Sequence, residues 1–294
     1  MIISGIDLHV HTNYSDGAFT PAEIIDMAAS SGIATLAIAD HDTVAGVAAG
    51  MGAGRQREVE VIPAVELSVQ FKEWHDVHLL GYGIDFADAD FLGRLERFRE
   101  ARLRRNDRIL ERVNEQLMCE GRTPLGRTEV QMHARDTVGR PHIARALLGA
   151  GHASSVEDAF RRYLVPCNIP KAYWPIEDAI QEIRSIGGVA VLAHPTSITG
   201  DRSLLRQLTE SLIGLGLDGL EVFNNQAQPD DMEFLRRLAL ERRLLITAGS
   251  DFHGIEPGLE MGKGRGGIRF DGSLLTPLLK LMAQRNQGRC SCSP

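Results

Sequence analysis

The sequence predicts an α/β protein whose parallel sheet closes, or nearly closes, into a barrel. Seven short apolar runs of strand length recur along the chain, capped helical segments separate several of them, and polar residues follow nearly every run. Repeated alternation of strand and helix is typical of parallel sheets with outer helices. With 294 residues, 43% of them hydrophobic, the chain can form one large domain or two smaller ones.

The expected strands are short and rich in aliphatic and β-branched residues, and they cover 6–11, 34–41, 59–68, 76–83, 188–195, 218–225 and 244–253. A helix is expected between the first two strands. Thr20 suits its N-cap, Pro21 its first turn and Glu23 a capping box, and Gly32 ends it. Similar signals frame helices over 175–188 and 229–243.

One long interruption separates the fourth and fifth strands. Apolar residues at helical spacing predict a long helix over 91–121, and shorter helices follow. We therefore expect a barrel made from residues 1–87 and 171–294, with a helical insertion at 88–170 that forms a substrate-binding lid. Residues 91–175 carry sixteen basic and ten acidic side chains within a chain of net charge −7, so the insertion is a candidate anion site.

Metal-type ligands follow nearly every expected strand. In a barrel the residues after the strands converge on one mouth, so these side chains become neighbours. His9 and His11 share a strand face at period two, and the same alternation pairs Asp251 with His253. Without cations, so many buried charges would carry a large desolvation penalty. The predicted metal ligands are His9, His11, Asp16, His41, Glu66, His78, His194, Asp251 and His253.

Nine ligands exceed the needs of one ion, and this nitrogen and oxygen set suits two or three divalent ions. Manganese is the expected metal, with iron or zinc as alternatives. The chain shows neither a secretion leader nor an apolar run long enough to span a membrane, which favours the cytoplasm. No obligate protein partner is evident, and no P-loop or nucleophile elbow is present.

The ordered motifs resemble the PHP family, the polymerase and histidinol phosphatase domain. They are "HVHTNYSDG", "ADHDT", the glutamate of "PAVELS", the histidine of "DVHLLGYG", "LAHP" and "GSDFHG". The resemblance implies a distorted (β/α)7 barrel with a site for two or three metals. It places His9, His11, Glu66 and Asp251 on one ion, bridging Glu66 with His78 and His194 on a second, and Asp16, His41 and His253 on a third. Asp40 and Asp42 are expected to orient His41.

The insertion, with its "GRPHIARAL" stretch, resembles that of stand-alone PHP phosphoesterases acting on nucleotides. These remove the 3′-phosphate from nucleoside 3′,5′-bisphosphates or trim RNA 5′ ends. The expected partner is therefore a small phosphorylated nucleotide, or short RNA ends. Arginine suits phosphate because its planar fork binds two oxygens at once. The predicted substrate-binding residues are Arg102, Arg105, Arg135, Arg140 and Lys171.

The predicted reaction is phosphomonoester hydrolysis by metal-activated hydroxide. Glu66 would bridge two ions, and Asp16 or His253, or the ion that they bind, would assist the leaving ribose oxygen. Alternatives remain open: a 5′-3′ exoribonuclease, a histidinol-phosphate-type phosphatase, a TatD-like or amidohydrolase-like enzyme, and a metal-binding module without catalysis. The glutamate of the third strand and the extra set Asp16, His41 and His253 argue against the TatD and amidohydrolase pattern.

Overall fold

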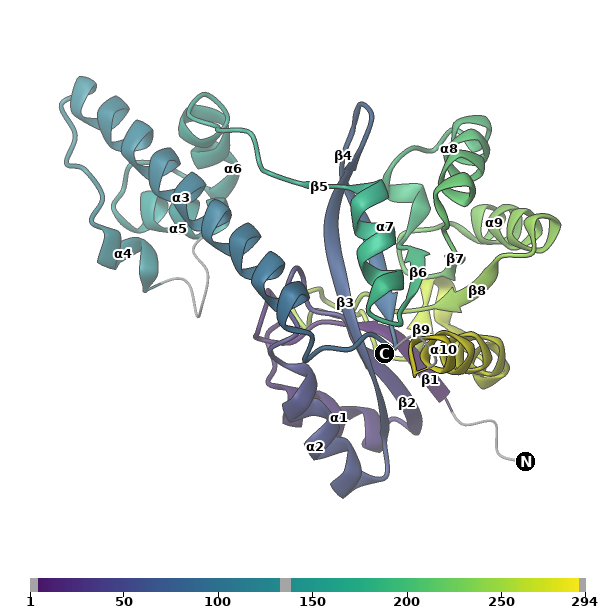
Figure 1. Ribbon diagram of the computed structural model, residues 1–294. Helices are drawn as coiled ribbons and strands as arrows, with labels where there is room; N and C mark the ends of the chain where they lie inside the picture. Colours follow the sequence, from purple (N-terminus) through teal and green to yellow (C-terminus); the bar gives the residue numbers. More distant parts are fainter. Residues whose placement is uncertain (1–4, 133–138, 291–294) are drawn as a thin grey trace. The chain divides into compact units, whose positions relative to one another are not determined.

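The computed structural model describes residues 5–132 and 139–290, and the chain divides into two compact units. The larger unit contains 1–93 and 173–294, and the smaller contains 94–172. The larger unit is built on a mixed sheet of eight strands covered by helices (Figure 1). The α/β fold class predicted from the sequence is confirmed.

The main path through the sheet runs β1-β2-β3-β4-β6-β7-β8, and β5 pairs separately with β3. The strands are β1 Gly5–Val10, β2 Ile33–Ile38, β3 Glu60–Phe71, β4 Trp74–Tyr82, β5 Trp174–Pro175, β6 Val189–Leu192, β7 Gly219–Phe223 and β8 Leu245–Ala248. A separate antiparallel pair consists of β9 Lys263–Gly264 and β10 Ile268–Arg269.

One strand corrects the expectation of a parallel sheet. β4 is antiparallel to both of its neighbours, β3 and β6, whereas the other pairs of the sheet are parallel. The reason lies in the connection: only Lys72 and Glu73 join β3 to β4. A parallel pair needs a crossover of a dozen or more residues, so this short turn makes a hairpin.

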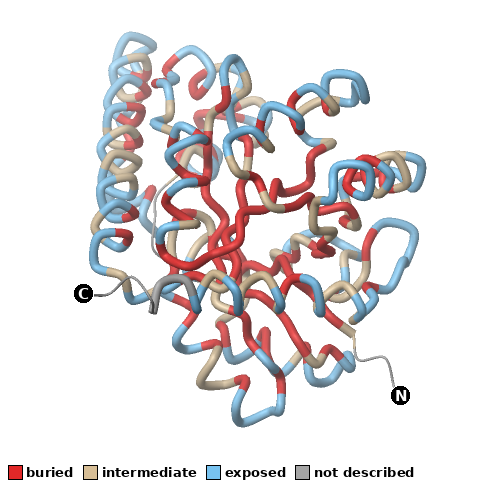
Figure 2. Tube along the Cα trace, turned by 45° about the vertical axis from the view of Figure 1, so that its right-hand side comes forward, coloured by how far each residue is buried: buried red, intermediate tan, exposed pale blue. Residues whose placement is uncertain are grey.

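The two ends of the sheet path meet beside the metal-ligand candidates. Val10 forms an isolated parallel bridge with Phe252. The amide of Asp251 donates to the carbonyl oxygen of His9, and the amide of His11 donates to the carbonyl oxygen of Phe252. The first strand is therefore joined to the segment after the last one. Figure 2 shows that buried residues follow the strands, while exposed residues occupy the outer turns of the helices.

The helices begin where capping signals indicated. The Thr20 hydroxyl accepts a hydrogen bond from the Glu23 amide, and the Glu23 carboxylate accepts one from the Thr20 amide. The predicted capping box is therefore present. The helices of the larger unit are α1 Pro21–Ser30, α2 Val47–Arg57, α7 Ile176–Ser185, α8 Arg202–Leu215, α9 Pro229–Arg242 and α10 Leu275–Cys290. Among the described residues, none of the helices is long and apolar enough to span a membrane.

The smaller unit is helical and has its own apolar cluster. Its elements are the long helix α3 Ala89–Cys119, which begins in the larger unit, then α4 Arg127–Gln131, α5 Arg140–Gly149, α6 Val156–Ala159 and a π-helical turn Phe160–Leu164. Ile109, Val113 and Leu117 of α3 pack with Ile143 and Leu147 of α5 in this cluster. The spacing of four along α3 places those residues on one helix face.

Candidate metal centre

The nine predicted ligands come from seven places in the chain, and the structure brings them together. His9 and His11 lie at the end of β1, Asp16 in the loop after it, and His41 just after β2. His194 follows β6, and Asp251 and His253 follow β8. Glu66 and His78 differ, because both lie inside the hairpin strands β3 and β4 rather than after a strand end.

The position of Glu66 follows from the length of β3. This strand has 12 residues, whereas β2 has 6, so β3 continues past the end of its neighbour. The amide of Glu66 donates to the carbonyl of Asp40, and the amide of Asp42 donates to the carbonyl of Glu66. These bonds place Glu66 just beyond the end of β2, beside His41.

Glu66 is the centre of the cluster, and its two oxygens face different histidines. Its Oε1 lies 3.0 Å from Nδ1 of His78 and 3.1 Å from Nε2 of His194. The other oxygen, Oε2, lies close to three rings: 2.9 Å from Nδ1 of His41, 3.2 Å from Nε2 of His9 and 3.3 Å from Nε2 of His11. A fully buried carboxylate in this position has the arrangement of a bridging ligand.

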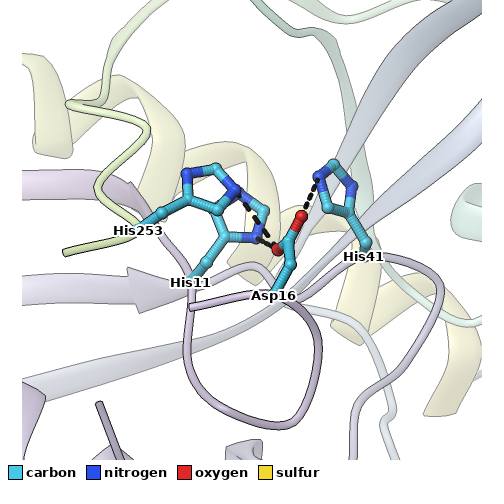
Figure 3. Close-up of side chains that lie close together, drawn as sticks. All are labelled: His11, Asp16, His41 and His253. Carbon is cyan, nitrogen blue, oxygen red and sulfur yellow. Dashed lines mark ion pairs between the residues drawn. The ribbon is translucent and has the colours of Figure 1, made fainter. Parts of the chain in front are cut away.

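Two further carboxylates complete the cluster. Oδ1 of Asp251 lies 3.1 Å from Nε2 of His11 and 3.5 Å from Nε2 of His9. Asp16 lies among three rings (Figure 3): its oxygens are 3.2 Å from His253, 3.7 Å from His11 and 3.7 Å from His41. The Asp16 side chain is 55% exposed, more than any of its partners, so it forms the solvent edge of the cluster.

The spacing of the ligand atoms, and the lack of well-directed hydrogen bonds at three of them, suit the cluster to cations. Three sets of ligand atoms each lie within 4.8 Å of one another: His11, Asp16, His41 and His253; His9, His11, Glu66 and Asp251; and His41, Glu66 and His78. Nδ1 of His11, Nδ1 of His41 and Oε2 of Glu66 are buried, and none of them makes a well-directed hydrogen bond in the described part of the chain, although ring nitrogens lie 2.9 to 3.3 Å from that oxygen. Such atoms normally have a partner, and a divalent ion would supply one. The cluster can therefore bind metal ions.

In the metal-free cluster, carboxylates and imidazoles shift each other's pKa values in opposite directions. Burial alone would raise the pKa of Glu66, but positive charge on His41, His9 and His78 holds it well below its usual range. Burial alone would lower the pKa of His11, but the carboxylates of Asp251 and Glu66 beside the ring raise it to about 10. Burial would also lower the pKa of His9, but the negative charges of Glu66 and Glu221 raise it well above its usual value. Protons therefore occupy positions that metal ions would take.

Asp251 and His253 come together as predicted, but the alternation of a strand does not cause it. Both residues lie beyond β8, which ends at Ala248. Asp251 has a left-handed backbone, with φ of 56°. The His253 Nδ1 lies 2.9 Å from the Asp251 carbonyl oxygen. A tight turn, rather than strand alternation, therefore sets their geometry.

Asp40 also has a different role from the expected one. Its side chain does not bond to His41 but accepts from the Thr12 amide and hydroxyl and from the Ser15 hydroxyl, each at 2.7 Å. It therefore fixes the loop that carries Asp16. Asp42 accepts the amide of Ser68 on β3 at 2.8 Å.

Two buried carboxylates beside the cluster were missed from the sequence. Asp7 accepts hydrogen bonds from the amides of His9, Ser250 and Gly262 and from the Ser250 hydroxyl. Glu221 lies against His9 and His194. The available signal was an acidic residue inside an apolar strand, "IDLHV" and "GLEVF". A buried carboxylate needs partners, and most partners of these two come from distant parts of the chain.

The predicted substrate-binding residues belong to the smaller unit, except for Arg135, which lies outside the described residues. Arg105 and Arg140 both donate to the Asn168 side-chain oxygen, at 2.9 and 3.4 Å. Arg112, which was not predicted, donates to the Asn168 carbonyl at 3.0 Å. Three guanidinium groups thus meet at one asparagine. Arg102 and Lys171 are partly buried in the same unit.

Comparison with known proteins gives consistent matches. The model of the PHP domain family matches residues 7–164. A 3′,5′-nucleoside bisphosphate phosphatase of Chromobacterium violaceum is 34% identical, over 85% of this chain and 88% of its own. The 5′-3′ exoribonuclease Rnm of Escherichia coli is also 34% identical, over 87% and 88%. A phosphoribosyl 1,2-cyclic phosphate 1,2-diphosphodiesterase of Eggerthella lenta is 32% identical, over 84% and 94%.

Solved structures agree with the sequence matches. A metal-dependent phosphoesterase structure from Bifidobacterium adolescentis has a TM-score of 0.78 and 29% identity, covering 95% of this chain and 96% of its own. A structure from Chromobacterium violaceum described as an amidohydrolase, with bound sulfate and no metal, has a TM-score of 0.75 and 31% identity. It covers 96% of this chain and 97% of its own.

The α/β fold and the buried cluster of histidines and carboxylates define a metal-dependent hydrolase. The chain belongs to the PHP domain family, and it is a metal-dependent phosphoesterase of that family.

Proposed function

We propose that this phosphoesterase removes the 3′-phosphate from nucleoside 3′,5′-bisphosphates and yields a 5′-mononucleotide and phosphate. The observation that carries the proposal is Glu66, whose two oxygens face separate groups of histidines. A carboxylate with that environment is suited to bridge two divalent ions, with Mn²⁺ proposed as the metal. The relative from Chromobacterium violaceum supports the choice of substrate.

The proposed ligand sets divide the cluster in three. His9, His11, Glu66 and Asp251 would hold one ion, Glu66, His78 and His194 a second, and Asp16, His41 and His253 a third. Divalent ions in such a site stabilise phosphoryl oxygens and lower the pKa of a water. Two of these proposed sets share Glu66, and the third lies beside it through His41, so they would present charge to a single phosphoryl group.

The chain's own groups supply the remaining chemistry. Although burial alone lowers the pKa of His253, its hydrogen bond with Asp16 raises it above its usual value. The Asp16–His253 pair lies at the exposed edge of the cluster. We assign this pair, or the ion that it would hold, to the leaving ribose oxygen, which must gain a proton as the ester bond breaks.

The smaller unit would hold the second phosphate. Arg105 and Arg140 each donate one N–H to the Asn168 side-chain oxygen, and two guanidinium groups so close together suit a phosphate. In this proposal the unit of residues 94–172 acts as the substrate-binding lid, with Arg102, Arg135 and Lys171 as further contacts.

A specific observation also favours a second function, 5′-3′ exoribonuclease activity on short RNA. The Escherichia coli exoribonuclease has the same identity to this chain as the bisphosphate phosphatase. A basic helical unit would suit either substrate, because both carry a phosphate beyond the scissile one.

The discriminating experiment measures phosphate release from adenosine 3′,5′-bisphosphate by manganese-loaded protein and identifies the nucleotide product. AMP, histidinol phosphate and a short 5′-phosphorylated RNA run in parallel. Rapid formation of 5′-AMP with poor turnover of AMP supports the proposal. Faster release of mononucleotides from the RNA would instead assign the exoribonuclease function.

Matched variants test whether Glu66 carries the activity. Glu66→Gln keeps the shape but removes the bridging charge, so kcat/KM should fall on the order of a thousandfold, as expected when several kcal/mol of charge stabilisation are lost. Glu60→Gln, at the exposed start of the same strand, should leave it unchanged. Full activity of Glu66→Gln would overturn the proposed mechanism.

A further inference from the structure

Glu221 on β7 is a completely buried carboxylate next to the cluster, and it lies outside all three ligand sets. Its two oxygens have separate partners. Oε1 lies 2.9 Å from Nδ1 of His9, and Oε2 accepts the backbone amide of His194 at 2.9 Å. These are the hydrogen bonds of its side chain within the described residues, and no arginine or lysine is among them.

The contact with His9 selects one form of that ring. A carboxylate oxygen only accepts, so Nδ1 of His9 must carry the proton and donate. Nε2 faces Oε2 of Glu66 at 3.2 Å and Oδ1 of Asp251 at 3.5 Å, and there a cation would take the place of the second ring proton. With the Nδ1 proton held by Glu221, the ring would bind a cation through Nε2.

The contact with His194 acts on the backbone. His194 has a φ of 25°, a conformation that is costly for a residue with a side chain and needs support from its surroundings. Its amide is held by Glu221, and its Nδ1 lies 2.9 Å from the Ser197 hydroxyl. Together these contacts direct Nε2 of His194 to Oε1 of Glu66, at 3.1 Å.

Close packing holds Glu221 in this position. Gly249, just after β8, approaches so closely that a Cβ there would lie 2.6 Å from Oε1 of Glu221 and 2.2 Å from Cβ of His9. The carboxylate is therefore confined between β7, the end of β1 and the segment after β8.

We propose that Glu221 is a positioning residue that sets two proposed metal-binding sites at once, fixing the tautomer of His9 in one and the backbone of His194 in the other. The inference rests on the proposed metal site. Partners of this kind orient ligands, and their loss typically weakens metal binding roughly 10- to 100-fold. Because one carboxylate serves both sites, its loss weakens both ions together.

The test measures Mn²⁺ and Zn²⁺ affinity by chelator competition for the wild type, Glu221→Gln and Glu221→Ala. Loss of the carboxylate in Glu221→Ala should weaken both of these sites roughly 10- to 100-fold. Glu221→Gln retains one hydrogen-bond acceptor, so its metal affinity should lie between those of the wild type and Glu221→Ala. The rise in melting temperature on adding metal should shrink in the same order. Nitrogen-15 spectra of the Zn²⁺-loaded wild type should show His9 with its proton on Nδ1, and this signal should be lost in Glu221→Ala.

Asp218→Asn is the matched control. Asp218 precedes the same strand and pairs with Arg285 at 2.6 Å and Arg184 at 3.2 Å, away from the cluster. This variant should lower the melting temperature equally with and without metal and leave metal affinity unchanged.

Two failures are distinguishable. A wild-type protein that binds neither metal would overturn the proposed function itself. Wild-type binding with unchanged affinity in Glu221→Ala, or weakening of one site alone, would overturn the role of Glu221 and leave the proposed function standing.

Discussion

At the residue scale, the site depends on side chains in backbone conformations that are unfavourable by themselves. His194 and Asp251 have φ of 25° and 56°, and Asp42, beside His41, has 52°. Each needs surrounding contacts to hold it. Two such contacts hold Asp42 against β3: its amide donates to the Glu66 carbonyl, and its carboxylate accepts a hydrogen bond from the Ser68 amide. Glu58, Lys72, Asp76 and Arg243 also have positive φ, so strained backbone occurs outside the site as well.

Metal affinity should rise with pH. In the metal-free protein the pKa of His11 is raised to about 10 and that of His9 is also raised, so both rings are protonated near neutral pH. A cation must displace these protons, so raising the pH from 6.5 towards 10 favours binding. Manganese affinity at several pH values and proton uptake or release in two buffers check this. An affinity independent of pH between 6.5 and 8.5 would contradict it.

At the element scale, the β3–β4 hairpin decides where the central ligand lies. The 12 residues of β3 carry Glu66 beyond the end of β2, and β4 returns antiparallel to bring His78 to the same carboxylate. A hairpin fixes the register between its strands, so Ser68 lies opposite His78. A crossover helix in place of the Lys72–Glu73 turn would have removed this pairing.

Two glycine substitutions should have opposite effects. Gly249→Ala places a Cβ 2.2 Å from that of His9, so it should destabilise the protein by about 1–3 kcal/mol and weaken metal binding. Gly52→Ala lies within α2 with no atom near its new Cβ and should stabilise by roughly 0.5–1 kcal/mol. Denaturant unfolding with and without metal measures both effects. Equal stability of the two variants would contradict the close packing at Gly249.

At the scale of the whole molecule, two units carry two different kinds of chemistry. The larger unit holds the histidine and carboxylate cluster, and the smaller one has its own apolar cluster and the arginines around Asn168. Since each unit has its own packed residues, substitutions of surface arginines in the smaller unit should leave the metal centre intact.

The arginines should act on substrate binding rather than on the chemical step. Arg105→Ala and Arg140→Ala should each raise KM for adenosine 3′,5′-bisphosphate about 10- to 100-fold, because a charged hydrogen bond to phosphate contributes roughly 1.5–3 kcal/mol. KM for adenosine 3′-phosphate, which lacks the 5′-phosphate, should change little. Arg104→Ala, paired with Glu100 on α3, is the control. Equal effects on both substrates would contradict a role at the 5′-phosphate.

The sequence by itself determined the α/β class, the helix caps such as Thr20 and Glu23, and the chemical identity of the nine residues that converge. These follow from local patterns: periodicity, capping chemistry and polar residues near strand ends. Only the tertiary structure decided that β3 and β4 extend until two residues separate them, that Glu66 faces two groups of histidines, and where Asp7 and Glu221 lie. The full length of a strand and most partners of a buried carboxylate depend on atoms distant in the chain, so local patterns do not encode them.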